Sequence, residues 1–478
     1  MSVTATAPPP TNRQAAVVRL GIGLVLVAQL MIVLDSAVVN VALPRIAADL
    51  HFTPAALTWV LNGYTLAFGG VLLLGGRIGD VYGRRRTFVV GLAAFTLCSL
   101  LGGLAPTAGL LVLARALQGL GAALAAPQVL ALVTTGAGAG NARARALALF
   151  AAVSSSGASI GLILGGVLTD LGSWRWTLFI NVPIGLAVLA LVHRYVPETP
   201  RRPGRFDVVG ALAATGGAVA IVWSLIGAAE HGWTSARTVG GIVVGLVLLA
   251  GLVVVERRVA HPLLRLQLFR SPRRVLSFVA MVGLIGAQFS TFYLTVTYLQ
   301  GVLRFGPLAS GLAFLPLSLA IFGMSRISPR IAGRIGMPAM LLVGGVGMTV
   351  SFLWLSLLDA DSGYAGAMLV PFILSGACAS MVFTASTALG MADVEPAHAG
   401  SASGLVQTMQ QLGGSIGLAV VASVYVAHGR PDAIVPGMPQ AFVAAAVLAS
   451  IGVLAALGTV LGGRLRRFVL ARAAAQVD

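Results

Sequence analysis

The sequence predicts an all-α integral membrane protein of fourteen transmembrane helices. Three observations predict this class: charge is scarce, apolar runs are long, and arginines gather in alternate loops. Only 9% of the 478 residues are charged, whereas a soluble domain carries about 25%. The mean hydropathy is +0.95. A chain with so little charge cannot cover a water-facing surface of ordinary size, so lipid must be its main solvent.

Long apolar runs give the number of spans. A helix needs about 20 apolar residues to cross the hydrocarbon core of a bilayer. Fourteen such runs lie at residues 20–43, 55–76, 87–105, 109–131, 144–168, 176–195, 207–228, 238–256, 274–300, 308–327, 338–358, 364–389, 400–426 and 439–462. The first run is too long for the core of a signal peptide and has no clear cleavage site, so we expect it to be a retained span.

The arginines give the orientation, because cytoplasmic loops of membrane proteins collect basic residues. With the N-terminus placed in the cytoplasm, 25 of the 31 arginines fall on the cytoplasmic side, five fall outside and Arg115 falls within a span. Both termini are therefore expected in the cytoplasm. The net charge of +17 comes from short loops and not from a long basic tail. It therefore indicates topology and does not indicate nucleic-acid binding.

The chain also repeats itself. Residues 77–83 (RIGDVYG) follow span 2, and the similar residues 330–336 (RIAGRIG) follow span 10. Residues 157–162 (GASIGL) in span 5 match residues 413–418 (GGSIGL) in span 13 at nearly the same offset. Spans 1–6 therefore correspond to spans 9–14, and spans 7 and 8 are inserted. Parallel repeats of six spans are found in secondary transporters, whose binding site lies between the repeats near the middle of the membrane.

This repeat divides the chain into five parts. We expect a cytoplasmic N-terminal tail at 1–19, an N-terminal six-helix half at 20–195, a linker with two inserted helices at 196–273, a C-terminal six-helix half at 274–462 and a cytoplasmic tail at 463–478.

The loop between spans 2 and 3 reads GRIGDVYGRRR over residues 76–86. It resembles the loop signature of the major facilitator superfamily, Gly-x-x-x-Asp-x-x-Gly-Arg-Arg. Glycines permit a tight turn, and an aspartate can bind a helix N-terminus or an arginine. The gating residues expected here are Gly76, Asp80, Gly83, Arg84 and Arg85. We expect Asp80, with Arg84, to hold the cytoplasmic side closed against the start of span 13 near Gly400 in the outward-open state. A plain positive-inside loop is the alternative.

Further strings are similar to those of the 14-span drug:proton antiporter family within this superfamily. They are LDSAVVNVALP at 34–44, WVLNGY at 59–64, LARALQGLGA at 113–122, SWRWTLFINVPIG at 173–185, HPLL at 261–264 and GSASGL at 400–405. The resemblance implies a major facilitator fold of two six-helix halves plus two inserted helices. It also implies a monomeric, proton-coupled exporter of small lipophilic or amphipathic compounds in a bacterial inner membrane, powered by the proton gradient without a cofactor.

Span 5 departs from the family pattern. A Gly-Pro step is typical there, but Leu162 stands where proline is expected. The span keeps glycines that we expect to let helices approach closely. These glycines are Gly157, Gly161, Gly165 and Gly166. The missing proline leaves the choice between antiport and another form of coupling open.

Asp35 in span 1 is the only acidic residue well inside a span, and the resemblance assigns proton coupling to Arg115 in span 4. From the rise of a helix, the two residues lie roughly 12 and 9 Å below the outer face, so they can meet. Burial favours a protonated carboxylate, whereas a nearby arginine favours the ionised form. We therefore expect Asp35 to carry the coupling proton and Arg115 to tune it. A static ion pair is the alternative.

The other candidates for the substrate pocket are neutral or aromatic. They are Asn40, Asn62, Tyr64, Gln128, Gln288, Phe292, Tyr293, Phe383, Gln407 and Gln411. We hypothesise neutral or singly charged amphipathic substrates, because a dication would require more than one carboxylate inside the membrane. The six histidines lie in loops or at span ends without metal-ligand spacing, and no phosphate-binding loop occurs. We therefore expect no metal site, no ATP-driven pump and no enzyme. A nutrient importer and a membrane sensor without transport remain as alternatives.

The loop analysis gives a first prediction. Asp80→Asn removes the charge that would close the cytoplasmic side but keeps the shape of the side chain. We expect reduced transport with folding largely intact, measured as substrate uptake into everted vesicles. Export at the wild-type rate would mean that the loop is only a topology signal.

Overall fold

A computed structural model describes residues 12–137, 141–199, 201, 207–258, 266–394, 399–429 and 435–474, and this part of the chain is helical without strands. The N-terminal half comprises α1 (Asn12–Leu50), α2 (Pro54–Leu57), α3 (Trp59–Tyr82), α4 (Arg84–Gly103), α5 (Ala108–Gly136), α6 (Asn141–Leu171), α7 (Trp176–Phe179) and α8 (Asn181–Tyr195). The inserted helices are α9 (Val208–His231) and α10 (Ala236–Arg258), followed by the 3₁₀ helix η1 (Leu266–Arg270).

The C-terminal half comprises α11 (Pro272–Gly301), α12 (Pro307–Ala313), α13 (Leu315–Ile335), α14 (Met337–Leu355), the π-helical turn η2 (Tyr364–Met368), α15 (Leu369–Gly390), α16 (Ala399–His428) and α17 (Met438–Ala474). Every predicted span coincides with one of these helices or with two consecutive ones. Within the described residues, thirteen spans are long and apolar enough to cross a membrane. The remaining predicted span is α6, whose described apolar part is Ile160–Leu171. The predicted fold class is confirmed.

Two helices extend beyond the predicted spans into the predicted tails. Helix α1 begins at Asn12, inside the predicted N-terminal tail, and α17 runs to Ala474, inside the predicted C-terminal tail. No proline or glycine follows Gly463 in α17. Because alanine, leucine and arginine favour helices strongly, the helix continues past the apolar run. Hydrophobicity therefore gave the length of the span but not the length of the helix.

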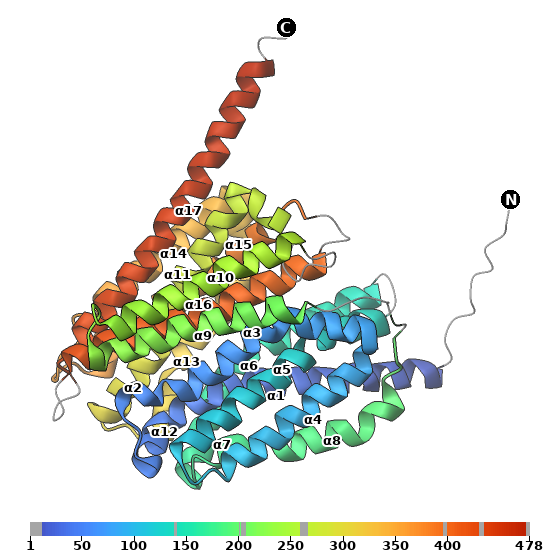
Figure 1. Ribbon diagram of the computed structural model, residues 1–478, viewed down its shortest axis with the longest axis horizontal. Helices are drawn as coiled ribbons and strands as arrows, with labels where there is room; N and C mark the ends of the chain where they lie inside the picture. The colour runs from blue at the N-terminus through green and yellow to red at the C-terminus, as the bar shows by residue number, and fades with distance from the viewer. Residues whose placement is uncertain are drawn as a thin grey trace, which may run out of the picture.

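The internal repeat reappears as a repeated packing pattern. In the N-terminal half α1 packs on α6, α3 on α5 and α4 on α8. In the C-terminal half α11 packs on α16, α13 on α15 and α14 on α17. In Figure 1 the two bundles lie one below the other, with α9 and α10 running in front of the boundary between them.

Apart from the contact of α3 with α16, the halves meet towards the end opposite the arginine-rich loops. Near the opposite end of the bundle, Gln300 Nε2 of α11 donates to the carbonyl oxygen of Val41 in α1 at 2.9 Å, and α6 packs on α12. Helix α5 packs on helices of the N-terminal half and α15 on helices of the C-terminal half. The arginine distribution places the contacting end outside, so this arrangement is closed to the outside.

The four span-5 glycines lie at close helix contacts. A Cβ atom at Gly157, Gly161 or Gly165 would fall within 3.0 Å of atoms in α1. One at Gly166 would lie 2.6 Å from the carbonyl oxygen of Pro307 in the other half. Helix α6 runs unbroken through Leu162, the position where the family pattern has proline. The glycines therefore set the distance of α6 from α1 and from α12.

This packing gives a second prediction. In Gly165→Ala the new methyl group would lie 2.4 Å from the carbonyl oxygen of Val38. We expect this overpacking to cost about 1–3 kcal/mol, measured as a lower thermal midpoint in detergent. Gly251→Ala in α10 is the control, because nothing lies within 4 Å of a Cβ atom there. Equal midpoints for the two variants would contradict the close contact of α6 with α1.

Candidate functional site

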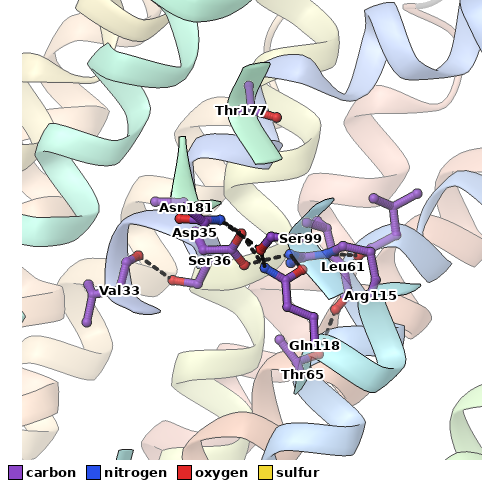
Figure 2. A network of polar contacts seen from close by, with 12 residues as sticks. Val33, Asp35, Ser36, Leu61, Thr65, Ser99, Arg115, Gln118, Thr177 and Asn181 are labelled. Atoms are coloured by element: carbon purple, nitrogen blue, oxygen red, sulfur yellow. Dashed lines mark hydrogen bonds and ion pairs between the residues drawn. The ribbon is translucent and has the colours of Figure 1, made fainter. Parts of the chain in front are cut away.

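Asp35 and Arg115 form an ion pair inside the N-terminal half. Asp35 lies on α1 and is 0% exposed, and Arg115 lies on α5 and is 1% exposed. Arg115 Nη1 donates to Asp35 Oδ2 at 2.6 Å (Figure 2). The two opposite charges therefore pair with each other in a buried position. Both are costly inside a membrane, and such residues are candidates for function.

Two amides complete the surroundings of the carboxylate. Gln118 Nε2 of α5 and Asn181 Nδ2 of α8 each donate to Asp35 Oδ1 at 2.8 Å. The same two nitrogens lie 2.6 and 3.2 Å from Ser99 Oγ of α4, which orients them. Figure 2 shows these side chains converging on Asp35 from different helices. Asn181 is the first residue of α8, directly after the break between α7 and α8.

Arg115 is held from the other side by α3. Its Nε donates to the carbonyl oxygen of Val60 at 3.1 Å, and its Nη1 also donates to Gln118 Oε1 at 2.7 Å. The guanidinium lies 4.4 Å from the centre of the Tyr64 ring, a cation–π distance. Helices α1, α3, α4, α5 and α8 therefore all contribute to one polar network.

The network suits an ionised carboxylate. Each of the hydrogen bonds described for the Asp35 side chain comes from an N–H group of Arg115, Gln118 or Asn181. An ionised carboxylate only accepts hydrogen bonds, whereas a protonated one must also donate. None of these three nitrogens can accept a proton from it. The three donors come from α5 and α8, so the carboxylate of Asp35 joins these two helices to α1.

The sequence analysis did not assign Gln118, Asn181 or Ser99 to the site. Gln118 and Asn181 lie within two of the strings that carry the family resemblance, at 113–122 and 173–185. Their position inside these strings was the signal that could have assigned both residues to the site. Ser99 gave none, because serine is common in packed membrane helices.

Two of the predicted pocket residues lie on α3. Tyr64 packs under Arg115, so it belongs to the ion-pair network. Its hydroxyl group and both amide atoms of Asn62 are buried and have no hydrogen-bond partner among the described residues. Gln128 Nε2 donates a hydrogen bond to the carbonyl oxygen of Gly75 at 2.8 Å, which joins α5 to α3.

The other predicted pocket residues are spread over α1, α11, α15 and α16. Gln288 Oε1 accepts from Ser375 Oγ at 2.8 Å, and the rings of Tyr293 and Tyr425 lie 6.4 Å apart. Phe383 is 54% exposed. The remaining four are partly exposed: Asn40, Phe292, Gln407 and Gln411. The ten candidates therefore lie on six helices, three in each half.

The predicted gating loop is attached to a distant segment. Asp80 accepts from Arg84 at 3.1 Å, one turn away. Gly83 has a φ of +107°, which a side chain would strain. The Glu198 carboxylate accepts from the backbone N–H groups of Arg85 and Arg86 at 3.0 and 3.2 Å, so it caps α4. Sequence reasoning missed Glu198, because the acceptor comes from more than a hundred residues away.

The predicted contact of this loop with Gly400 belongs to the outward-open state, and the side chains of residues 399–401 lie outside the described residues. The HPLL string at 261–264 lies outside them as well. The described residues contain no group of three or more His, Cys, Asp or Glu side chains that could hold a metal ion.

The profile of the Major Facilitator Superfamily matches residues 25–418. The chain belongs to this superfamily. It is a multi-pass membrane protein of a family that transports small molecules, as the resemblance in the sequence implied.

Two relatives are named for antibiotics. The chain is 41% identical to the puromycin resistance protein pur8 of Streptomyces alboniger, covering 91% of this chain and 88% of the relative. It is 38% identical to the cephamycin export protein CmcT of Amycolatopsis lactamdurans, covering 88% of each. Among solved structures, the POT family transporter PepTSo superposes with a TM-score of 0.68 over 96% of this chain and 99% of the other at 16% identity, which supports the fold.

The capping contact of the transporter gives a third prediction. Glu198→Gln weakens two hydrogen bonds at the start of α4, and losing such a cap costs about 1 kcal/mol. We expect faster amide hydrogen exchange at residues 83–87, with the rest of the bundle unchanged. Glu230→Gln, at an exposed position near the end of α9, is the control. Unchanged exchange in the Glu198 variant would show that the loop is held by other contacts.

Proposed function

We propose that this transporter exports small amphipathic antibiotics in exchange for protons. The observation that carries the proposal is the buried carboxylate of Asp35, held by three N–H donors beside Arg115. The names of the two relatives, a resistance protein and an export protein, support the outward direction. Proton exchange is our inference from the site.

In the proposed cycle, the described arrangement is the ionised form of Asp35. The halves touch at the outer end, so substrate binds from the cytoplasmic side. When the halves rock, the N-terminal helices shift and Arg115 moves away from Asp35. A proton from outside then binds the carboxylate as substrate leaves. The protonated form returns, Arg115 approaches again, and the proton is released to the cytoplasm.

The substrate class follows from the charges inside the spans. Asp35 is paired with Arg115, so the N-terminal half offers no free negative charge to a cationic substrate. Neutral or singly charged amphipathic molecules fit this environment better than dications. Import of a nutrient is the second candidate, because the fold alone does not give direction.

We place the transporter in the bacterial inner membrane as a monomer, with the proton gradient as its energy source and no cofactor, nucleic-acid partner or enzymatic activity. A knockout tested on a panel of toxic compounds distinguishes an exporter, whose loss sensitises the cell, from an importer.

The proton role of Asp35 gives a fourth prediction. Asp35→Asn cannot take up or release a proton, so we expect it to bind puromycin but to lose uphill, proton-driven efflux in proteoliposomes. Asp49→Asn is the control, because Asp49 also lies on α1 but pairs with Arg175 near the outer surface. Retained uphill efflux by the Asp35 variant would assign the proton to another group.

A static ion pair would behave differently. Leaving Arg115 buried without its partner costs about 3–5 kcal/mol, so Asp35→Asn alone can fail by unfolding. The double variant Asp35→Asn, Arg115→Gln removes both charges. If it restores stability but not uphill efflux, the carboxylate carries the proton. If it restores both, the pair is only structural.

A further inference from the structure

The internal repeat can be followed residue by residue where helices touch at glycines. In the N-terminal half, a Cβ atom at Gly119 of α5 would collide with the carbonyl oxygen of Tyr64 in α3. In the C-terminal half, a Cβ atom at Gly376 of α15 would collide with the carbonyl oxygen of Leu317 in α13. The two contacts are equivalent, because they join span 2 to span 4 in one half and span 10 to span 12 in the other. Gly119 therefore corresponds to Gly376.

A second pair of contacts gives the same correspondence. A Cβ atom at Gly91 of α4 would lie 2.7 Å from the carbonyl oxygen of Gly121 in α5. One at Gly344 of α14 would lie 3.1 Å from the carbonyl oxygen of Cys378 in α15. Gly121 and Cys378 each lie two residues after the glycine of the first contact. Each residue of α5 around these glycines can therefore be matched with one residue of α15.

The match between α5 and α15 removes the positive charge of the ion-pair network. Gln118 corresponds to Ser375, since each stands directly before the matched glycine. Arg115 corresponds to Phe372, three residues earlier in each helix. Phe372 is 0% exposed, so a buried aromatic ring occupies the place that a buried guanidinium has in the N-terminal half.

The negative charge is replaced as well, because Asp35 of α1 corresponds to Gln288 of α11. The spacing of these two residues equals that of the loop repeat after spans 2 and 10. The hydrogen bonds agree with this match. Gln118 donates to Asp35, and its counterpart Ser375 Oγ donates to Gln288 Oε1 at 2.8 Å. The C-terminal half therefore contains an uncharged counterpart of the ion-pair network.

The amide of Gln288 is only half paired. Gln288 is 7% exposed, and its Nε2 is buried without a hydrogen-bond partner among the described residues. Ser375 occupies the amide oxygen alone. A buried donor without an acceptor is costly, so such a group in a native protein requires an acceptor from elsewhere. Inside a membrane that acceptor is either a water molecule or a bound substrate.

An aromatic cluster lies beside this amide. Phe292 stands one turn after Gln288 on α11 and is partly exposed. Its ring lies 5.6 Å from the ring of Phe314, which stacks on Phe372 at 5.8 Å. Phe314 and Phe372 are buried, so Phe292 is the accessible edge of the three rings. Helix α11 packs on α1 of the other half, and Gln288 therefore lies on a helix that borders the space between the halves.

We propose that Gln288 Nε2 binds an uncharged acceptor oxygen of the exported molecule, such as an amide or ketone carbonyl, while an aromatic ring of that molecule packs on Phe292. This inference rests on the proposed export function. The carbonyl oxygen supplies the acceptor that the Gln288 amide lacks, and the ring extends the aromatic cluster. Gln288 and Phe372 carry no charge, so this subsite selects a carbonyl group beside a ring and offers nothing to a cation.

The test measures equilibrium binding of tritiated puromycin to the purified transporter in detergent. Puromycin carries a methoxyphenyl ring beside an amide carbonyl, whereas puromycin aminonucleoside lacks both groups and is measured by competition. Gln288→Met removes the donor and keeps the length of the side chain. Thr291→Val is the matched control on α11, because the Thr291 hydroxyl group already donates to the carbonyl oxygen of Ala287 in the same helix.

We expect Gln288→Met to weaken puromycin binding about fivefold, the effect of losing one hydrogen bond, and to leave binding of the aminonucleoside unchanged. Thr291→Val should change neither compound. A glutamine that only supports the fold would weaken both compounds alike, and a glutamine that binds only water would weaken neither. Either result overturns the proposal, as does a wild-type protein that does not bind puromycin.

A second variant tests the ring without disturbing the amide. Phe292 is partly exposed, so Phe292→Leu should fold normally and weaken binding of puromycin about threefold, again without an effect on the aminonucleoside. Unchanged puromycin binding in this variant would overturn the assignment of the ring to Phe292. If the variants differ in binding as expected but the wild-type protein does not carry puromycin uphill in proteoliposomes, the export proposal fails and the subsite stands.

Discussion

The burial of one negative charge in a lipid-facing protein constrains the N-terminal half of this transporter. Asp35 is fully buried, and Arg115, Gln118 and Asn181 supply its hydrogen bonds. These residues come from α5 and α8, and Ser99 of α4 orients the amides. Because the donors lie on separate helices, a movement of any of these helices changes the stability of the ionised carboxylate. The same requirement therefore organises the packing and, in the cycle that we propose, links the charge of Asp35 to helix movement.

The sequence predicted the spans and the heights of the two charged residues for one reason. Both depend on distance along a helix, which the chain encodes directly. The partners of Asp35 depend on which helices face α1. The sequence does not show whether a glutamine or serine only packs against a neighbouring helix or also binds the carboxylate network. Glu198 shows the limit most clearly, since its role as a cap depends on a loop that folds back onto α4. The ten pocket candidates were chosen by residue type alone, and the structure spreads them over both halves.

The inserted helices could be counted from the sequence but not placed by it. Helix α10 is apolar on nearly every side, which indicates lipid contact but does not show which face of the bundle it approaches. The contact of α9 with both α3 and α16 is set by small residues, such as Gly70 against Thr215. An insertion that at first resembles a spacer between repeats is thus part of the core, and it makes two otherwise equivalent sides chemically different.

The hydroxyl contacts between α3 and α16 have a consequence for how freely the halves can part. Thr65 Oγ1 lies 3.1 Å from the carbonyl oxygen of Leu61 in its own helix, as well as 2.6 Å from Ser415. When the helices separate, the Thr65 hydroxyl group keeps an acceptor within its own helix, so it is not left without a partner in hydrocarbon. The bond between the halves is therefore replaceable at little energetic cost. Such a contact can align the two halves and still be broken and formed again in every transport cycle.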